Sequence, residues 1–447
     1  MENLKNRIFH FLLIFISFLY IILFIYLPKI NLIKDINFST NNYYALYKRS
    51  EIFSQTIIIL FVIFILYCLF FYGIKNNFFE IKFKRLFLFS VIVSFFSIIV
   101  FPIFSSDIFY YICSDRVFAI HHLSPFTNTY ASLSGDYFQD IFHGYSWETH
   151  LNNYGPIFIL LSSIPVLLFS KNLFLSIVLW KFICIIINII NGYLVYKITK
   201  SEKIYFLYAF NPLLIFELCL NAHNEVLMIF FILLAFFYIF KKPCIKNYLL
   251  SMVFLVLSIL TKIFSLVFLP IFFLLMFLGL KSKKQRFQFL IFSTILLLII
   301  IILSYWPFHT NIKDIISPII FQSSFTSSIF VSPLIQLIWY GIYFFSGKDF
   351  FHIASFVSRF VFLISYVGIL FWALFKKNKH FSKLILISST IIFTIFILTF
   401  FSWLMPWYFT TIICLNFLSY FFSNKKVYLM MNFFFTLYGI CFYFVLR

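Results

Sequence analysis

The sequence has few charged residues, and acidic residues are the scarcest. Of its 447 residues, 14 are Asp or Glu, and charged residues of both signs make up 11%. Hydrophobic residues make up 63%, the mean hydropathy is +1.03, and apolar runs long enough to cross a bilayer core of roughly 30 Å recur along the chain. Because lipid offers the backbone no hydrogen-bond partners, such runs must be helical. We expect an all-α, polytopic transmembrane helix bundle in which residues 1–447 form a single integral membrane domain.

Metal-binding and redox motifs are also absent. The seven cysteines are scattered and none forms a C-x-x-C pair, so nothing indicates a disulfide framework or a metal site. There is no Asp-x-Asp motif, although hard cations need several oxygen ligands. The net charge of +20 does not indicate a nucleic-acid partner, because the lysines lie in short clusters between apolar runs, as in the cytoplasmic loops of membrane proteins.

These basic clusters predict which loops face the cytoplasm. Lys5 and Arg7 place the N-terminus inside, and the group at 75–85 is inside again after two apolar runs. The segments 105–155 and 307–332 are then extracytoplasmic loops.

Two apolar runs, 156–170 and 333–346, are near the lower length limit for crossing. All basic groups lie inside only if neither run crosses, so we interpret both as re-entrant or juxtamembrane helices. Residues 247–280 must then form a hairpin of two short helices that turns near Thr261 and Lys262. This arrangement predicts about 13 spans.

The loop 105–155 collects polar residues that are rare elsewhere. It follows the apolar run 86–104 and contains a single basic residue, Arg116. It holds five of the acidic residues and four of the nine histidines: Asp107, Asp115, Asp136, Asp140, Glu148, His121, His122, His143 and His150. An acidic loop at the end of a membrane helix is a place where polar chemistry meets a lipid-borne substrate.

Several further charged residues lie within or beside apolar runs, where each costs about 2.5–3.5 kcal/mol at mid-depth. The clearest are Lys181, Glu217, Glu225 and Lys262. Either they form ion pairs between helices or they serve a site. Most of the polar residues that remain unexplained fall on the predicted extracytoplasmic face, which favours a shared site.

The same polar segments form an ordered set along about residues 86–420. They are Ser-Asp-Ile-Phe-Tyr-Tyr at 106–111, Asp-Arg-Val at 115–117, Leu-Ser-Pro-Phe at 123–126, Tyr-Gly-Pro-Ile at 154–157, Phe-Asn-Pro-Leu-Leu at 210–214, Asn-Ala-His-Asn-Glu at 221–225, Lys262, and Met-Pro-Trp-Tyr at 405–408. In this order they resemble the GT-C membrane glycosyltransferases, especially the bacterial polyprenol-phosphomannose-dependent α-mannosyltransferases.

The resemblance implies a fold and a reaction. The expected fold is a GT-C bundle whose first extracytoplasmic loop is catalytic and carries juxtamembrane helices. The expected donor is a polyprenyl-phosphate-linked sugar, with mannose favoured, and the acceptor is a glycan or a lipid-linked glycan. The implied location is a bacterial inner or plasma membrane, with the active site outside the cytoplasm. No general acid is needed, since the leaving phosphate is already anionic, and we predict no cofactor or metal.

Such a reaction needs one base for the acceptor hydroxyl and donors for the leaving phosphate. Asp107 is the predicted base, acting with inversion, because it lies at the water boundary beside an apolar span. Helix capping by Ser105, Ser106 or Asp107 is the structural alternative.

The other predicted residues have structural alternatives too. Lys181, Lys262 and His223 are predicted to bind the donor phosphate, although both lysines could instead snorkel to the headgroups. The predicted sugar- or acceptor-binding residues are Asp115, Arg116, Asn224, Glu225, Tyr154, Trp407 and Tyr408. Asp115 and Arg116 also suit a structural role, Tyr154 suits a turn with Gly155, and the aromatic residues suit an interfacial belt.

Two other functions stay open. A transporter or flippase of lipid-linked saccharides would place buried charges near the midplane, often in repeated halves. The chain shows no internal repeat. A polysaccharide polymerase or ligase would use a diphosphate-linked donor. Only the resemblance separates this function from that of a glycosyltransferase with a polyprenyl-phosphate donor.

Overall fold

The computed structural model describes residues 2–27, 50–76, 78, 82–102, 105–316, 320, 331–376 and 380–445. Within these ranges the chain is helical and contains no β-strand, as the sequence predicts. Half of the predicted loop 307–332, and all of residues 28–49, lie outside the described residues.

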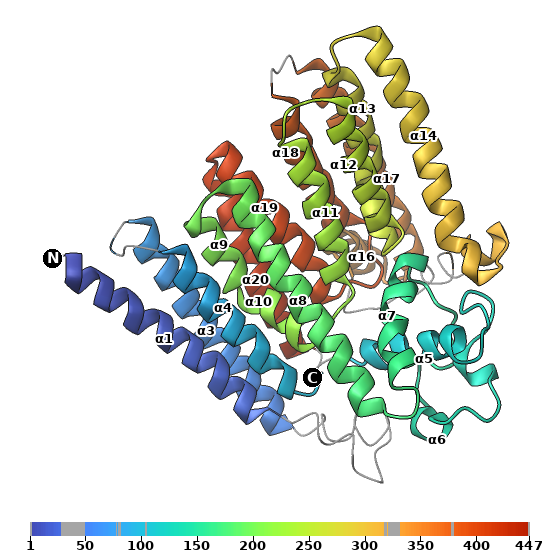
Figure 1. Cartoon of the computed structure of the whole chain (residues 1–447), viewed down its shortest axis with the longest axis horizontal. Helices are drawn as coiled ribbons and strands as arrows, with labels where there is room; N and C mark the ends of the chain where they lie inside the picture. The colour runs from blue at the N-terminus through green and yellow to red at the C-terminus, as the bar shows by residue number, and fades with distance from the viewer. Residues whose placement is uncertain are drawn as a thin grey trace.

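The helices form a bundle with a smaller group of short helices at one end (Figure 1). The N-terminal part comprises α1 (Glu2–Tyr26), α3 (Ser50–Lys75), α4 (Phe83–Phe96) and the short turn η2 (Ser97–Ile99). The short group comprises α5 (Asp107–Ala119), α6 (Gln139–Phe142) and α7 (Pro156–Leu168), and α7 leads into the long helix α8 (Leu173–Thr199).

The second half of the chain supplies the rest of the bundle. Its elements are α9 (Glu202–Ala209), α10 (Pro212–Leu214), η4 (Ile215–Leu220), α11 (Glu225–Ile239), α12 (Ile245–Ile259), η5 (Ile263–Phe268), α13 (Leu269–Gly279), α14 (Lys283–Tyr305), α16 (Pro333–Ser346), α17 (Phe351–Phe375), α18 (Phe381–Thr399), η7 (Pro406–Tyr408), α19 (Phe409–Ser423) and α20 (Lys426–Val445).

Five described helices are long and apolar enough to cross a membrane, and a bent pair would make six. The bent pair is Glu202–Ala209 with Pro212–Leu220, which meet at 48°. Asn211 causes the break, because its side chain accepts hydrogen bonds from the amides of Leu213 and Leu214 and so caps a new helix that starts at Pro212. Six shorter apolar helices accompany these, so the total of about 13 spans stays a prediction.

The predicted short helices are present. The two apolar runs that we interpret as re-entrant or juxtamembrane helices form α7 and α16. Both helices are shorter than a normal membrane span. Helix α12 ends at Ile259 and η5 begins at Ile263, so the chain breaks where the hairpin turn was predicted.

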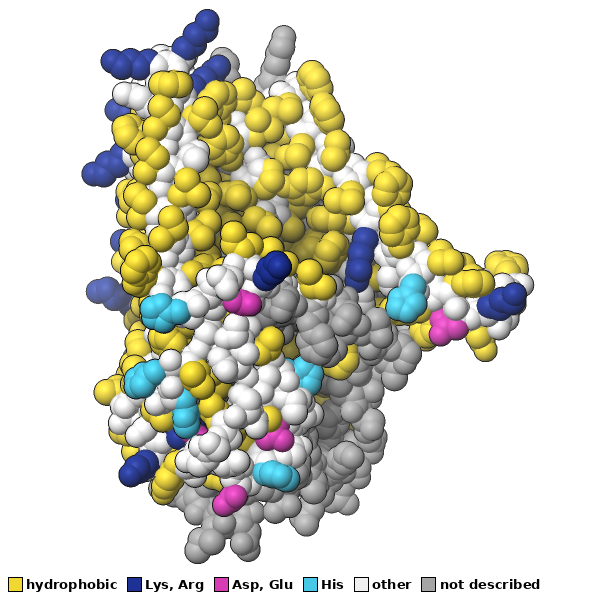
Figure 2. All heavy atoms as spheres, turned by 90° about the vertical axis from the view of Figure 1, so that its right-hand side faces the viewer, with side chains coloured by type: hydrophobic (Ala, Val, Ile, Leu, Met, Phe, Trp, Pro, Cys, Tyr) yellow, Lys and Arg dark blue, Asp and Glu magenta, His cyan; other side chains and the backbone are white. Residues whose placement is uncertain are grey.

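Side chains of different kinds separate on the surface. Viewed from the right-hand side of Figure 1, apolar side chains cover the upper part, whereas His, Asp and Glu side chains lie among polar ones in the lower part (Figure 2). The site described next belongs to the polar end, where α5 and α7 meet the bundle.

Candidate active site

Asp107 is the first residue of α5, where a negative charge is favoured by the helix dipole. Its backbone amide donates to Ser105 Oγ at 3.2 Å, and its carboxylate accepts a hydrogen bond from Tyr154 Oη at 3.3 Å. The carboxylate is therefore held from outside the helix and is not consumed in capping. The side chain is 20% exposed, so it is partly accessible from outside the protein.

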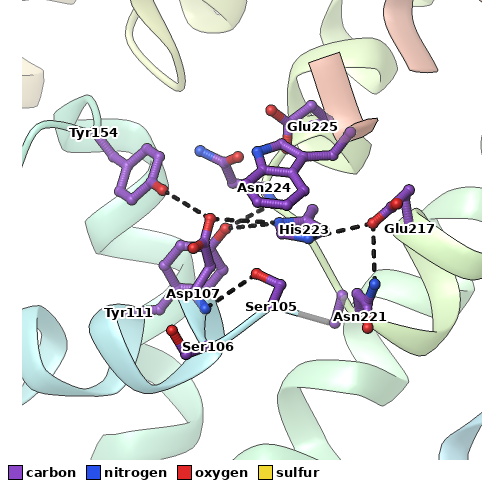
Figure 3. Close-up of polar contacts among 12 residues, drawn as sticks. Ser105, Ser106, Asp107, Tyr111, Tyr154, Glu217, Asn221, His223, Asn224 and Glu225 are labelled. Carbon is purple, nitrogen blue, oxygen red and sulfur yellow. Dashed lines mark hydrogen bonds and ion pairs between the residues drawn. The ribbon is translucent and has the colours of Figure 1, made fainter. Parts of the chain in front are cut away.

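His223 lies next to Asp107 and is fully buried. Its Nδ1 is 3.5 Å from Asp107 Oδ2 and 3.5 Å from Tyr111 Oη (Figure 3). Its Nε2 is 3.3 Å from Glu217 Oε2. Trp407 stacks on the imidazole ring with centroids 4.1 Å apart and planes 18° apart. The ring is thus fixed between two carboxylates and covered by an indole.

The contact between His223 and Asp107 shifts the pKa values of both groups. Burial disfavours the imidazolium, yet the pKa of His223 is raised to about 9, because Asp107 and Glu217 both favour the charged form. Burial likewise opposes the charged form of Asp107, and its place beside an apolar span predicts a raised pKa. That prediction is wrong, because His223 and Lys262 hold the pKa of this carboxyl below its ordinary value. At neutral pH the pair is an ionised carboxylate beside an imidazolium.

A strained backbone turn delivers His223 to this position. The preceding residue, Ala222, has a φ of +55°, a left-handed conformation that costs a residue with a Cβ roughly 1–2 kcal/mol. Trp180 Nε1 donates to the carbonyl oxygen of Ala222 at 3.1 Å and holds the turn. Strain of this kind is concentrated at functional sites.

Lys262 forms the second charged pair of the site. Its ammonium is ion-paired with Glu225 Oε1 and donates to Asn224 Oδ1 at 3.3 Å. It also faces the rings of Tyr408 and Tyr154, with Nζ 4.8 and 5.5 Å from their centroids. The structure therefore brings these predicted residues into one cluster with Asp107 and His223.

A backbone contact joins the hairpin that carries Lys262 to the loop that carries Tyr154. The amide of Gly155 donates to Thr261 O at 3.1 Å, and the amide of Ile157 donates to Leu260 O at 3.0 Å. A Cβ at Gly155 would lie 1.9 Å from the carbonyl oxygen of Leu260. Glycine is required by this close approach, in addition to the turn that the sequence predicts.

Three predicted residues lie outside the cluster. Lys181 is fully buried in α8, and its ammonium donates to the carbonyls of Ser97, at 2.8 Å, and Val100, at the end of the α4–η2 segment. Asp115 is buried and accepts a hydrogen bond from Ser162 Oγ at 2.7 Å. Burial raises its pKa well above the ordinary value.

Arg116 is the third of these residues, and it stabilises the loop. Its Nε donates to both carboxylate oxygens of Asp136, at 2.8 and 2.9 Å, and its Nη1 donates to Ser170 O at 2.6 Å. Asp136 also accepts from Tyr130 Oη at 2.6 Å and contacts His121 Nε2 at 2.8 Å. Burial acts against ionisation, but these donors lower the pKa of Asp136 to about 2.

Two residues that contribute to the site, Glu217 and Tyr443, were not among the predicted site residues. Glu217 stood out as a buried charge without an assigned role, and the hydroxyl of Tyr443 donates to it from α20. Within the described ranges no group of three or more His, Cys, Asp or Glu side chains is placed to hold a metal ion. Independence from metals and cofactors stays a prediction.

Comparisons with known proteins bear on this cluster. Residues 44–278, more than half of the chain, match the family described as "Alpha-(1->6)-mannopyranosyltransferase, N-terminal domain". A comparison with curated proteins gave no match. Among solved structures, the Archaeoglobus fulgidus oligosaccharyltransferase tethered with an acceptor peptide is similar at a TM-score of 0.38 and 14% identity. The alignment covers 81% of this chain and 53% of that one, so the chain spans about half its length. The match over residues 44–278 shows that the chain belongs to the alpha-(1->6)-mannopyranosyltransferase family.

Proposed function

We propose that the chain transfers mannose from a polyprenyl-phosphate donor to a hydroxyl group of a glycan or lipid-linked acceptor on the extracytoplasmic face, with Asp107 as the general base. The observation that carries this proposal is the carboxylate of Asp107. It is ionised at neutral pH, partly exposed, and oriented by Tyr154 and His223. A general base needs this combination of charge, access and fixed geometry.

The proposed step is a single displacement. The acceptor oxygen forms a bond to the anomeric carbon while the bond from that carbon to the phosphate oxygen breaks, and its electron pair leaves with the phosphate. The acceptor proton moves to a carboxylate oxygen of Asp107. Attack opposite the leaving group inverts the anomeric configuration.

Lys262 is the cation best placed to meet the leaving phosphate. An ammonium group has three N–H donors. Glu225 and Asn224 accept two of them in the described structure, and the side chain is 4% exposed beside Tyr154 and Tyr408. By contrast, both ring nitrogens of His223 face carboxylates, which favours an orienting role over phosphate binding.

Polar atoms beside Lys262 support sugar binding nearby. Asn224 Nδ2 and Glu225 Oε2 are buried and have no hydrogen-bond partner within the described structure. Buried polar atoms of this kind are normally paired, with protein, water or a ligand. We assign both atoms to hydrogen bonds with the hydroxyl groups of a bound sugar.

The test is transfer from a synthetic short-chain polyprenyl-phosphate mannose by purified wild type, Asp107→Asn and Asp140→Asn. Asp140 is an exposed carboxylate of the same loop and serves as the matched control. We expect Asp107→Asn to lose about 10²- to 10⁴-fold in rate and the control to match wild type.

Each alternative has its own outcome in this experiment. Transfer by Asp107→Asn at the wild-type rate would remove the base assignment. Release only from a diphosphate-linked donor would favour the polymerase or ligase, and no release from any donor sugar would favour the transporter.

A further inference from the structure

Glu217 is a buried acid that the proposed reaction does not yet use. It lies in the π-helical turn η4 and is fully buried. An isolated carboxylate at such a position would be strongly destabilising, so its partners should show why it is there.

Both carboxylate oxygens of Glu217 have defined partners. Oε1 accepts a hydrogen bond from Tyr443 Oη of α20. Oε2 accepts from Asn221 Nδ2 at 3.0 Å and lies 3.3 Å from His223 Nε2. Tyr443 thus holds one oxygen of the carboxylate, and Asn221 holds the oxygen that faces the imidazole ring of His223 (Figure 3).

These contacts continue to the base. From Tyr443 a row of polar groups runs through Glu217 and His223 to Asp107, and its members come from α20, η4, the 221–224 turn and α5. An imidazolium donates from both ring nitrogens, and here each nitrogen faces a carboxylate. Glu217 and Asp107 therefore face the two nitrogens of one ring.

We propose that Glu217, held by Tyr443 and Asn221, is a positioning residue that keeps the ring of His223 aimed at Asp107. The proposal rests on the proposed function, with Asp107 as the base. Glu217 contacts no reacting atom. Its carboxylate fixes the ring, and the ring fixes the base at the point where it receives the acceptor proton.

Other charged and titratable groups face this row. Tyr111 approaches His223 Nδ1 from α5, while Tyr154 approaches Asp107. Glu225 and Lys262 lie close enough to act on Glu217 and Asp107 respectively. They stay unchanged in the variants below, so a shift in pH dependence reports on Glu217.

The experiment measures kcat, KM and the pH profile of wild type, Glu217→Gln and Tyr443→Phe. We expect Glu217→Gln to lower kcat by up to about 100-fold, as misplacement of a catalytic group does, with KM changed less than about threefold. The loss of a carboxylate that favours the imidazolium should move the alkaline limb downward by about one pH unit. Tyr443→Phe should give a smaller change in the same direction.

Tyr208→Phe is the matched control. It also removes a buried tyrosine hydroxyl, whose hydrogen bond to Asn188 Oδ1 at 2.8 Å lies outside the row. It should leave kcat and the pH profile at wild-type values. If Glu217→Gln does not fold, Tyr443→Phe carries the test.

A second readout needs no turnover. The ¹⁵N-histidine NMR titration of His223, identified by its loss in His223→Asn, should show a lower pKa in Glu217→Gln than in wild type. An unmoved titration and pH profile would overturn the proposal and leave Glu217 a structural role. An inactive wild type with a shifted titration would instead contradict the proposed function alone.

Discussion

Oδ2 of Asp107 lies 3.5 Å from Nδ1 of His223, and this contact joins the first helix of the polar loop to the turn before α11. It places a carboxylate of lowered pKa beside an imidazole group of raised pKa. The pair therefore has a definite protonation state over a wide pH range, and that state can be tested.

The first prediction concerns pH. Transfer should be constant around neutral pH, fall as pH rises through about 9 when His223 loses its proton, and fall in acid below the ordinary Asp value of 3.8 when Asp107 gains one. His223→Asn should abolish the alkaline limb. An alkaline limb that survives in this variant would mean that another group titrates there.

The same pair contributes to stability. The pKa of His223 is higher in the folded state, so its contribution is complete below the ordinary value of 6.5 and is lost as pH rises to about 9. The contribution of Asp107, whose pKa is lowered, is present above 3.8 and is lost in more acidic solution. Thermal unfolding at pH 6 and pH 9.5 should show a larger decrease for wild type than for His223→Asn.

The second prediction separates charge pairing from catalysis at Lys262. Lys262→Met leaves Glu225 as a buried unpaired acid, so we expect a loss of about 3–5 kcal/mol of unfolding free energy. Lys262→Met combined with Glu225→Gln removes both charges and should recover most of that stability but no transfer. Recovered transfer in the double variant would show that Lys262 does not meet the phosphate.

The third prediction concerns the contact between two backbone segments. Gly155→Ala inserts a Cβ 1.9 Å from Leu260 O, so the loop and the hairpin must separate. We expect a loss of about 1–3 kcal/mol and a fall in kcat. Gly341→Ala is the control, because nothing lies within 4 Å of its Cβ. Equal stability and activity of the two variants would contradict this reading.

The fourth prediction concerns the loop itself. Asp136→Asn should weaken the contacts with Arg116 and His121 and make residues 105–155 more sensitive to limited proteolysis, at a cost of up to about 3–5 kcal/mol. Asp140 is an exposed carboxylate four residues further on. The Asp140→Asn variant should be cleaved by the protease at the wild-type rate. If Asp136→Asn leaves the loop as resistant to proteolysis as in wild type, apolar packing alone holds this segment.

Much of the cluster could be predicted from the sequence, because polar side chains are rare in so apolar a chain. Asp107, His223 and Lys262 stood out against their neighbours, and the structure brings them together. The membrane helices were predictable because long apolar runs separated by polar residues are visible in the hydropathy of the sequence.

Other features could not be predicted. Lys181 and Lys262 look alike in sequence, because each is a single lysine in an apolar run. Only tertiary packing determines that Lys181 donates to backbone carbonyls whereas Lys262 forms an ion pair with Glu225. Tyr443 is one of 28 tyrosines, with no local signal that its hydroxyl reaches Glu217. Asp136 sits in an irregular segment, where burial depends on how the whole loop folds.

The contact of Gly155 with Leu260 involves main-chain atoms on both sides. Main-chain atoms therefore set the spacing between Lys262 and Tyr154, whose hydroxyl donates to Asp107. Substitutions of the surrounding side chains that keep glycine at 155 should therefore leave this spacing unchanged.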